Sequence, residues 1–229
     1  MFYYYGRKKQ IAGYYPEPHC DVIVEPFAGA AAYSLHKENW RKDVLLIEKD
    51  RQVYDIWEWL INEASEGEIL NLPTLKVGEK SSEFLHIIHA VTKMAFQFKT
   101  IKVTAVLERN WEISRRMMAK NLHKIKHWQI INDDYSAAPD IRATWFIDPP
   151  YKGEAGLGYR HSSKLLDYDK LANWALAREG EIIFCEGKEG DYLPFNALVD
   201  LKGVAGKVNK ERLFYRSNII HPTGLFNAM

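Results

Sequence analysis

Short apolar runs alternate with helical patterns along this chain, which is typical of a mostly parallel β-sheet covered by helices. Seven apolar runs predict strands; they cover residues 20–26, 43–48, 128–132, 143–148, 181–185, 196–201 and 213–220. Helices are expected after the first two runs, over residues 27–38 and 49–64, and Val53, Trp57 and Leu60 share one face of the second. The pattern therefore predicts an α/β fold.

The middle of the chain differs from the two parts that flank it. From residue 65 to 128 the pattern is helical, over stretches at 81–98 and 103–125, with no convincing strand. Because the strand pattern resumes afterwards, the simplest interpretation is a mainly helical region inserted between two strands of one sheet.

Composition limits the class of protein. A chain of 229 residues with 47% hydrophobic residues can bury a substantial core, and its net charge of +1 excludes a basic surface over the whole molecule. Cys20 and Cys185 have no zinc-ligand spacing and cannot form a disulfide framework, so both are expected in the core. No secretory or membrane-spanning segment is evident, and we expect a cytoplasmic protein with no membrane partner.

Polar and small residues follow the first three predicted strands, where parallel sheets bind ligands. Gly29 and the alanines beside it allow close approach of a ligand, although such runs also simply pack a helix on a sheet. Glu48 can accept hydrogen bonds from both hydroxyls of a ribose; the alternative is a solvated carboxylate at the end of a strand. Asp134 and Tyr135 can contact an adenine, or form an Asx turn. Together these residues favour a nucleotide-like ligand.

The stretch TWFIDPPYKG, residues 144–153, ends a buried strand in an acid, two prolines and a tyrosine. An exocyclic amine on a base is a poor nucleophile, because its lone pair is delocalised into the ring. Asp148 offers one acceptor for its N–H groups, and Pro149, which has no N–H, leaves only a carbonyl as the second. Tyr151 can then stack on the base. An isolated Asp-Pro pair is often only a turn, but that does not explain the tyrosine.

Several short motifs make the chain resemble the Dam-like DNA adenine-N6 methyltransferases, in particular the compact versions common in phages and prophages. In chain order the motifs are YYGRKKQ, EPFAGAAA, LLIEKD, NDDY, DPPY, FCEG and ERLFY. DPPY is the specific one, and its place after the cofactor motifs matches the alpha group of that family. One departure concerns Ala31, which stands where the family usually has the second glycine after EPF. We expect it to narrow the pocket around the methionine part of the cofactor.

The resemblance implies a Rossmann-like methyltransferase sheet with helices on both faces, formed by residues 1–64 and 129–229. It implies that residues 65–128 are a smaller, mainly helical, inserted target-recognition domain. The catalytic residues that it implies are Asp148, Pro149, Pro150 and Tyr151. The residues that it implies for binding S-adenosylmethionine are Tyr4, Lys8, Glu25, Phe27, Gly29, Glu48, Asp134, Tyr135 and Asp148.

The implied activity is site-specific methylation of the exocyclic amine of an adenine flipped out of double-stranded DNA. The expected partners are double-stranded DNA and a cognate restriction endonuclease, and the protein is expected to be a monomer. Methylation of another planar amine stays open: adenine in RNA, N4 of cytosine in DNA, or a glutamine side chain. A catalytically silent DNA-binding relative also stays open. Aspartate as the first residue of DPPY favours adenine in DNA.

A local excess of cations supplies the only sequence evidence for how a nearly neutral protein holds DNA. Between residues 90 and 128 nine Lys and Arg residues stand against two acids. The expected phosphate contacts are Lys99, Lys102, Arg109, Arg115, Arg116 and Lys120. The alternative is a solvated helix face on which Glu112 pairs with Arg116. Histidines at 86, 89, 123 and 127 show helical spacing without a third ligand, so no metal is expected.

Overall fold

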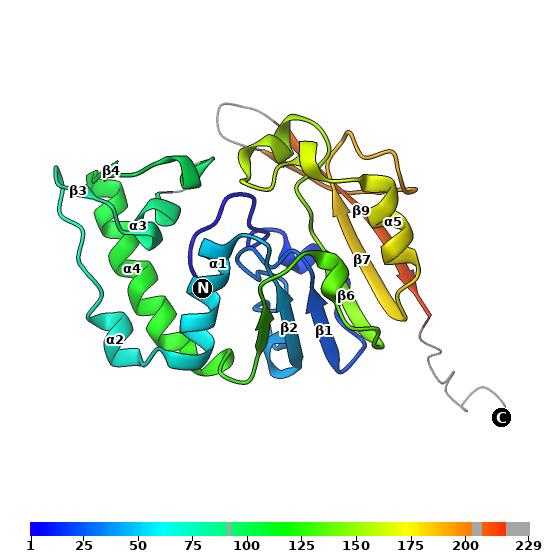
Figure 1. Cartoon of the computed structure of the whole chain (residues 1–229), viewed down its shortest axis with the longest axis horizontal. Coiled ribbons are helices and arrows are strands. Elements are labelled where there is room, and N and C mark those ends of the chain that lie inside the picture. Colours follow the sequence, from blue (N-terminus) through cyan, green and yellow to red (C-terminus); the bar gives the residue numbers. More distant parts are fainter. Residues whose placement is uncertain (91–92, 203–207, 219–229) are drawn as a thin grey trace, which may run out of the picture.

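The computed structural model describes residues 1–90, 93–202 and 208–218. Its centre is one sheet of seven strands in the order β5-β2-β1-β6-β7-β9-β8 (Figure 1). The strands are β1 (Val22–Glu25), β2 (Asp43–Ile47), β5 (Gln129–Ile131), β6 (Ala143–Ile147), β7 (Gly180–Glu186), β8 (Asn196–Lys202) and β9 (Val208–Ser217). All seven predicted runs form strands, including the expected pairing of β8 with β9. The predicted end of the last run, 219–220, lies outside the described residues.

The sheet is parallel except at one strand. β9 is antiparallel to its two neighbours, β7 and β8, and the other strands share one direction. Without β9 the strands follow the order 3-2-1-4-5-6 of doubly wound sheets, and the order reverses between β1 and β6. The fold is therefore mixed α/β and compatible with a Rossmann-like fold, in which ligands bind outside the carboxyl ends of strands at that reversal.

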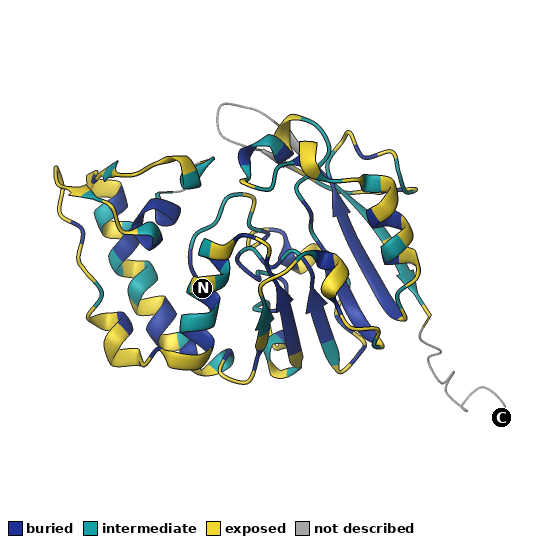
Figure 2. Cartoon of the chain, viewed as in Figure 1, coloured by how far each residue is buried: buried dark blue, intermediate teal, exposed yellow. Residues whose placement is uncertain are grey.

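Helices cover both faces of the sheet. Successive strand residues point to opposite faces, so Ile183 packs in one core cluster with Trp57 of α1, whereas Ile182 packs in another with Leu171 of α5. Helix α1 (Arg51–Glu58) continues as the π-helical turn η3 (Trp59–Glu63), and α5 is Tyr168–Leu176. Figure 2 shows the central strands buried on both faces and the helices exposed only on their outer sides. Cys20 and Cys185 are buried and free, as expected.

The prediction of a helix over residues 27–38 is wrong. This segment forms a series of turns and bends, and a short 3-10 helix, η2 (Asn39–Arg41), follows it. Gly29 and Ala31 have φ of +46° and +45°, which no right-handed helix accommodates. In addition, two N–H groups of the segment, those of Gly29 and Ser34, bond to buried carboxylates instead of helical carbonyls. Glu48 Oε2 accepts from the Gly29 N–H at 3.0 Å.

Residues 65–128 contain the helices α2 (Glu66–Leu70), α3 (Phe84–His89) and α4 (Ala105–Asn121). Trp111 of α4 belongs to the same core cluster as Trp57 of α1. Two expectations need correction here. Two short strands, β3 (Lys80–Ser81) and β4 (Ile101–Lys102), pair antiparallel where no strand was predicted. The helix predicted over 81–98 is limited to α3; residues 91–92 lie outside the described part, and Met94 has a left-handed φ of +56°.

Short 3-10 helices complete the described chain. They are η1 (Ala12–Tyr14), η4 (Ala95–Gln97), η5 (Leu122–Lys124), η6 (Tyr135–Ala137), η7 (Glu154–Gly158) and η8 (Ser163–Leu165). In the described ranges, every helix is too short or too polar to cross a membrane.

Candidate functional site

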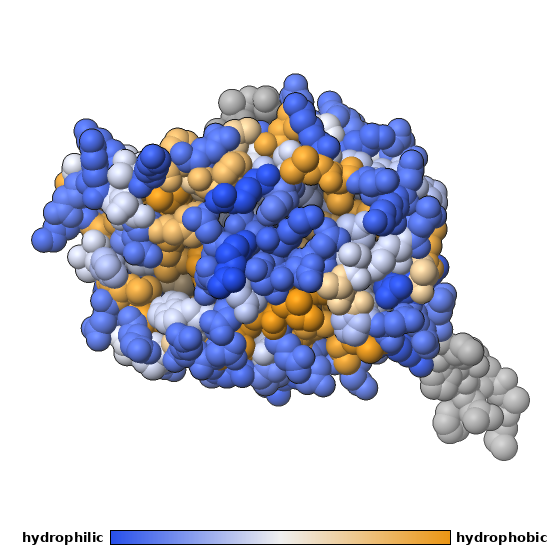
Figure 3. Space-filling view, in the orientation of Figure 1, coloured by the Kyte–Doolittle hydropathy of each residue, from blue (hydrophilic) through white to orange (hydrophobic). Residues whose placement is uncertain are grey.

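A cavity of about 240 Å³ lies at the carboxyl ends of the strands that flank the reversal of strand order. Its lining includes every residue that the sequence assigned to cofactor binding: Tyr4, Lys8, Glu25, Phe27, Gly29, Glu48, Asp134, Tyr135 and Asp148. Pro150 also lines it, whereas Pro149 and Tyr151 do not. In the space-filling view, hydrophilic residues gather over the middle of this face of the molecule (Figure 3). The strand ends thus bring residues far apart in sequence to one concave site.

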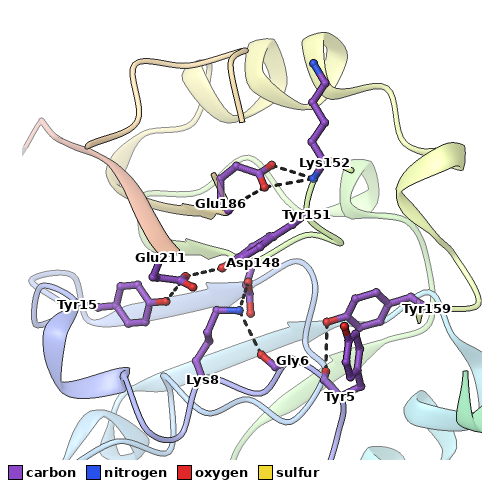
Figure 4. Close-up of polar contacts among 11 residues, drawn as sticks. Tyr5, Gly6, Lys8, Tyr15, Asp148, Tyr151, Lys152, Tyr159, Glu186 and Glu211 are labelled. Carbon is purple, nitrogen blue, oxygen red and sulfur yellow. Dashed lines mark hydrogen bonds and ion pairs between the residues drawn. The ribbon is translucent and has the colours of Figure 1, made fainter. Parts of the chain in front are cut away.

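Asp148 follows β6 directly, and its half-buried side chain forms an ion pair with the buried Lys8. Lys8 Nζ lies 2.7 Å from Asp148 Oδ1 and donates to the Gly6 carbonyl at 3.2 Å (Figure 4). Burial raises the pKa of Asp148, and the Lys8 ammonium opposes that rise. Burial by itself lowers the pKa of Lys8, but the carboxylates of Asp148 and Glu211 outweigh it and hold the pKa above its ordinary value. Lys8 is therefore a fixed cation that favours the ionised form of Asp148.

Glu48 follows β2 and is buried beneath the pocket. Its two carboxylate oxygens accept from backbone N–H groups on opposite sides, Gly29 at 3.0 Å and Asp50 at 2.8 Å. Burial raises the pKa of Glu48 to about 7, although these hydrogen bonds act in the other direction. The carboxylate is held in one orientation, and each oxygen has a second lone pair for a ligand hydroxyl.

Glu25 is the last residue of β1 and also faces the pocket. Its Oε1 accepts from the Ser34 N–H at 2.8 Å, which ties the turn after β1 to the strand end. Burial raises the pKa of Glu25 to about 8, with a smaller contribution from the charge of Asp148. Two carboxyls with raised pKa thus lie at adjacent strand ends, and a cationic ligand bound there favours their ionised form and releases their protons.

Aromatic rings form another wall of the pocket. Phe27 and Tyr135 stack with their centroids 5.6 Å apart and their planes at 26°. Asp134 stands beside them and pairs with Lys49 at 2.9 Å. Burial raises the pKa of Asp134. Hydrogen bonds from Lys49 and Ser136 lower it by more than burial raises it, so the pKa lies below its ordinary value. Asp134 also caps η6 by accepting from the Ser136 N–H, so the Asx-type turn and the pocket position coexist.

Tyr151, which is expected to stack on the base, is held through its hydroxyl. Its hydroxyl donates to Glu211 Oε1, and Tyr15 donates to the same oxygen at 2.6 Å (Figure 4). The Lys8 ammonium lies 4.6 Å from the centroid of the Tyr151 ring. Sequence reasoning gave Glu211 no role, although the ERLFY motif contains it. Tyr151 and Tyr15 precede Glu211 by 60 and 196 positions, and no local feature of the sequence predicts that Glu211 contacts residues so distant.

The loop after Tyr151 closes over the N-terminal segment, which sequence reasoning also missed. Arg160 Nε lies 3.2 Å from Asp50 Oδ2, and the Tyr159 hydroxyl donates to the Tyr5 carbonyl at 3.2 Å. Gly6 sits under this loop with φ of +76°, and a Cβ there would lie 2.1 Å from the Tyr159 hydroxyl. Both Tyr159 and Arg160 line the pocket. The loop therefore forms one wall of the site.

Five of the six cations expected to contact DNA are exposed, and one is not. Lys99, Lys102, Arg109, Arg116 and Lys120 are exposed. Arg115 instead turns inward, with 13% of its side chain exposed, and donates to the Leu72 carbonyl and to Glu112. Glu112 thus pairs with Arg115 and not with Arg116. Near α4, His86 bonds to Ser81 and the Pro73 carbonyl, and no metal-holding group of His, Cys, Asp or Glu occurs in the parts of the chain that the structure describes.

Comparison with known proteins adds no relative: no protein-family model matches the chain, and no curated protein matches it. The fold and the geometry of this pocket therefore carry the inference of function.

Proposed function

We propose that this protein is a site-specific DNA adenine-N6 methyltransferase that uses S-adenosylmethionine. The observation that carries the proposal is the position of the Asp-Pro-Pro-Tyr segment. It leaves the strand on one side of the reversal of strand order, and its Asp148 faces a pocket whose other walls come from the ends of β1 and β2. Reactive acceptors and a nucleotide-sized cavity thus share one site.

The side chains of the pocket fit S-adenosylmethionine. Phe27 and Tyr135 offer aromatic surface for an adenine ring, and Glu48 offers fixed oxygens for ribose hydroxyls. Positive charges on the ligand favour the ionised forms of Glu25 and Glu48, the two carboxyls whose pKa burial raises. When bound, this cofactor supplies an electrophilic methyl carbon on a sulfonium.

The catalytic task of the chain is to make an aromatic amine nucleophilic. Asp148 accepts a hydrogen bond from the amine, which localises the nitrogen lone pair toward the methyl donor. Lys8 keeps that carboxylate ionised and fixes its orientation. Pro149 offers its carbonyl as the second acceptor, because it has no N–H to compete. The N–C bond would form as the S–C bond of the bound cofactor breaks with its electron pair left on sulfur, and the amine would pass one proton to the Asp148 carboxylate.

The alternatives make different demands on this site. A catalytically silent DNA-binding relative has no need for an ion pair between the buried Lys8 and the half-buried Asp148, whose partial desolvation costs stability. Methylation of adenine in RNA or of cytosine N4 requires the same acceptors and is distinguished by its product.

The proposal is tested by incubating the protein with methyl-labelled S-adenosylmethionine and, in separate reactions, double-stranded DNA of varied sequence or RNA, then analysing the nucleosides by mass spectrometry. We expect N6-methyladenine at a defined sequence. Label only in RNA, or only in N4-methylcytosine, would replace the proposal with the corresponding alternative. No label in any substrate would favour the silent relative.

Asp148→Ala should lower turnover at least about a hundredfold, because positioned hydrogen bonds at a reacting centre have effects of that size. Asp140→Ala is the matched control: Asp140 precedes β6 at the opposite end of the strand, and its side chain is 84% exposed. The control should keep parental turnover. A folded Asp148→Ala protein that methylates at the parental rate would rule out the mechanism.

A further inference from the structure

Glu211 is a buried carboxylate that the proposed mechanism does not use. It lies in β9, the one described strand of the large sheet that runs against its neighbours, and only 7% of it is exposed. Burial raises the pKa of Glu211, and the charge of Lys8 opposes that rise. Removing a carboxylate from water costs free energy, so a carboxylate in the core requires hydrogen-bond donors that compensate for the lost water.

The partners of Glu211 are two tyrosine hydroxyls from distant segments. Tyr15 and Tyr151 both donate to Glu211 Oε1 (Figure 4). The Tyr15 ring is anchored edge-on against Phe146, with centroids 5.1 Å apart. The Tyr151 ring is also confined near its Cδ2 atom. Gly187 packs against it there so closely that a Cβ added to Gly187 would lie 3.1 Å from Tyr151 Cδ2. Glu211 and Gly187 therefore hold the two ends of the Tyr151 ring.

The Tyr151 ring in turn contacts the reactive pair. Lys8 Nζ lies 4.6 Å from the ring centroid and 2.7 Å from Asp148 Oδ1. A cation is attracted to the face of an aromatic ring, so a change in the position of the Tyr151 ring moves the preferred position of the Lys8 ammonium. A continuous series of contacts thus leads from Glu211 through Tyr151 and Lys8 to Asp148.

We propose that Glu211 is a positioning residue of the active site, which fixes the Tyr151 ring through its hydroxyl and thereby fixes the Lys8–Asp148 pair. This role rests on the proposed function, because it concerns the rate of amine methylation. β9 would then contribute to the site as well as to the sheet, because this antiparallel strand places the Glu211 carboxylate against Tyr151 of the Asp-Pro-Pro-Tyr segment.

A double-mutant cycle tests the role. Glu211→Ala and Tyr151→Phe each remove one end of the same hydrogen bond, and each should lower kcat about tenfold with KM for DNA changed less than about twofold. The double variant should be no slower than the slower single variant, because the bond can be lost only once. Glu211→Gln, which keeps a carbonyl acceptor, should recover kcat to within about threefold of the parent.

The matched controls are Tyr215→Phe and Glu181→Gln. Glu181 is also buried and accepts from a tyrosine hydroxyl, that of Tyr215 at 2.7 Å, but it pairs with Thr144 at the opposite end of the strands. Both controls should keep kcat within about twofold of the parent. If kcat losses multiply in the double variant, or if the controls lose as much as Glu211→Ala, Glu211 only supports the fold and the inference is overturned.

A second measurement does not require activity. In protein labelled with ¹³C at tyrosine Cζ and lysine Cε, Tyr151→Phe and Lys8→Arg assign the two resonances. We expect Glu211→Ala to shift the Tyr151 resonance and, through the moved ring, the Lys8 resonance, whereas Tyr215→Phe shifts neither. Unmoved resonances overturn the inference even in an active enzyme. Shifted resonances in a protein that methylates nothing uphold the contact series while the proposed function fails.

Discussion

Glu48 shows how burial determines the chemistry of one side chain. The carboxyl is enclosed at the end of β2, and burial raises its pKa to about 7. Its backbone partners, Gly29 and Asp50, only partly compensate for the lost water. A group with this pKa changes charge near neutral pH, so any ligand that binds it inherits a dependence on pH.

The pKa of Glu48 leads to a prediction for cofactor binding. Ribose hydroxyls bond more strongly to the ionised carboxylate, so binding should hold Glu48 ionised and release a proton. As pH falls below about 7, protonated Glu48 must first lose its proton, and the Kd for S-adenosylmethionine should rise about tenfold per pH unit.

Titration calorimetry in two buffers of different ionisation enthalpy would measure both the Kd and the released proton. Glu48→Gln cannot ionise, so its weaker binding should lose this part of the pH dependence. An equal pH dependence in the parent and in Glu48→Gln would assign the titration to another group and remove Glu48 from the ribose site.

At the scale of elements, the segment between β1 and β2 carries strain at Ala31. Its φ of +45° is a conformation that favours glycine, yet its side chain is buried and lines the pocket. Left-handed backbone costs an alanine about 1 to 2 kcal/mol, whereas glycine adds roughly 0.5 to 1 kcal/mol of unfolded-state entropy. We expect Ala31→Gly to raise the free energy of unfolding by about 0.5 to 1 kcal/mol.

Urea denaturation would measure this change, with Ala30→Gly as the control. Ala30 is a buried neighbour outside the left-handed region, so its replacement should lower the free energy of unfolding by about 0.5 to 1 kcal/mol. Opposite signs for adjacent alanines are the expected result. A loss of stability in both variants would show that the turn does not strain Ala31.

At the scale of the whole molecule, a net charge of +1 means that the proposed DNA affinity requires a local basic surface. Arg109, Arg116 and Lys120 are exposed on α4, in the region that projects beside the seven-stranded sheet in Figure 1. Exposed Ile113 lies on the same helix, so the face combines cations with apolar surface. Cations of this spacing suit phosphate contacts, which depend strongly on salt.

Replacing Arg109, Arg116 and Lys120 together by alanine should flatten the dependence of log affinity on log salt by up to about three units, near one per lost contact. DNA affinity measured across a salt series would show this change.

Arg115→Ala is the matched control on the same helix. Because Arg115 is held by the Leu72 carbonyl and Glu112, it should keep the parental slope and lower the free energy of unfolding by about 1 to 3 kcal/mol. Equal slopes in the parent and triple variant would move the search for the DNA surface to the N-terminal YYGRKKQ segment.

The sequence by itself determined the strands and the acids at their ends. Apolar runs and the residues that end them are local features, and parallel strands place their carboxyl ends along one edge. For that reason the sequence alone predicts that Glu48, Asp134 and Asp148 share one pocket, and the folded chain brings them together there.

Only the tertiary structure decided what depends on contacts between distant residues. The Ala-rich stretch after β1 has a helical composition, but buried carboxylates of Glu25 and Glu48 capture its N–H groups and turn it. Likewise, Glu211 meets Tyr151 because β9 inserts between β7 and β8, and Arg115 turns inward because Leu72 and Glu112 lie beside it. A periodic pattern specifies which face of an element is apolar, but the partner of each polar group is chosen by the fold, because an unpaired polar group inside it would be too costly.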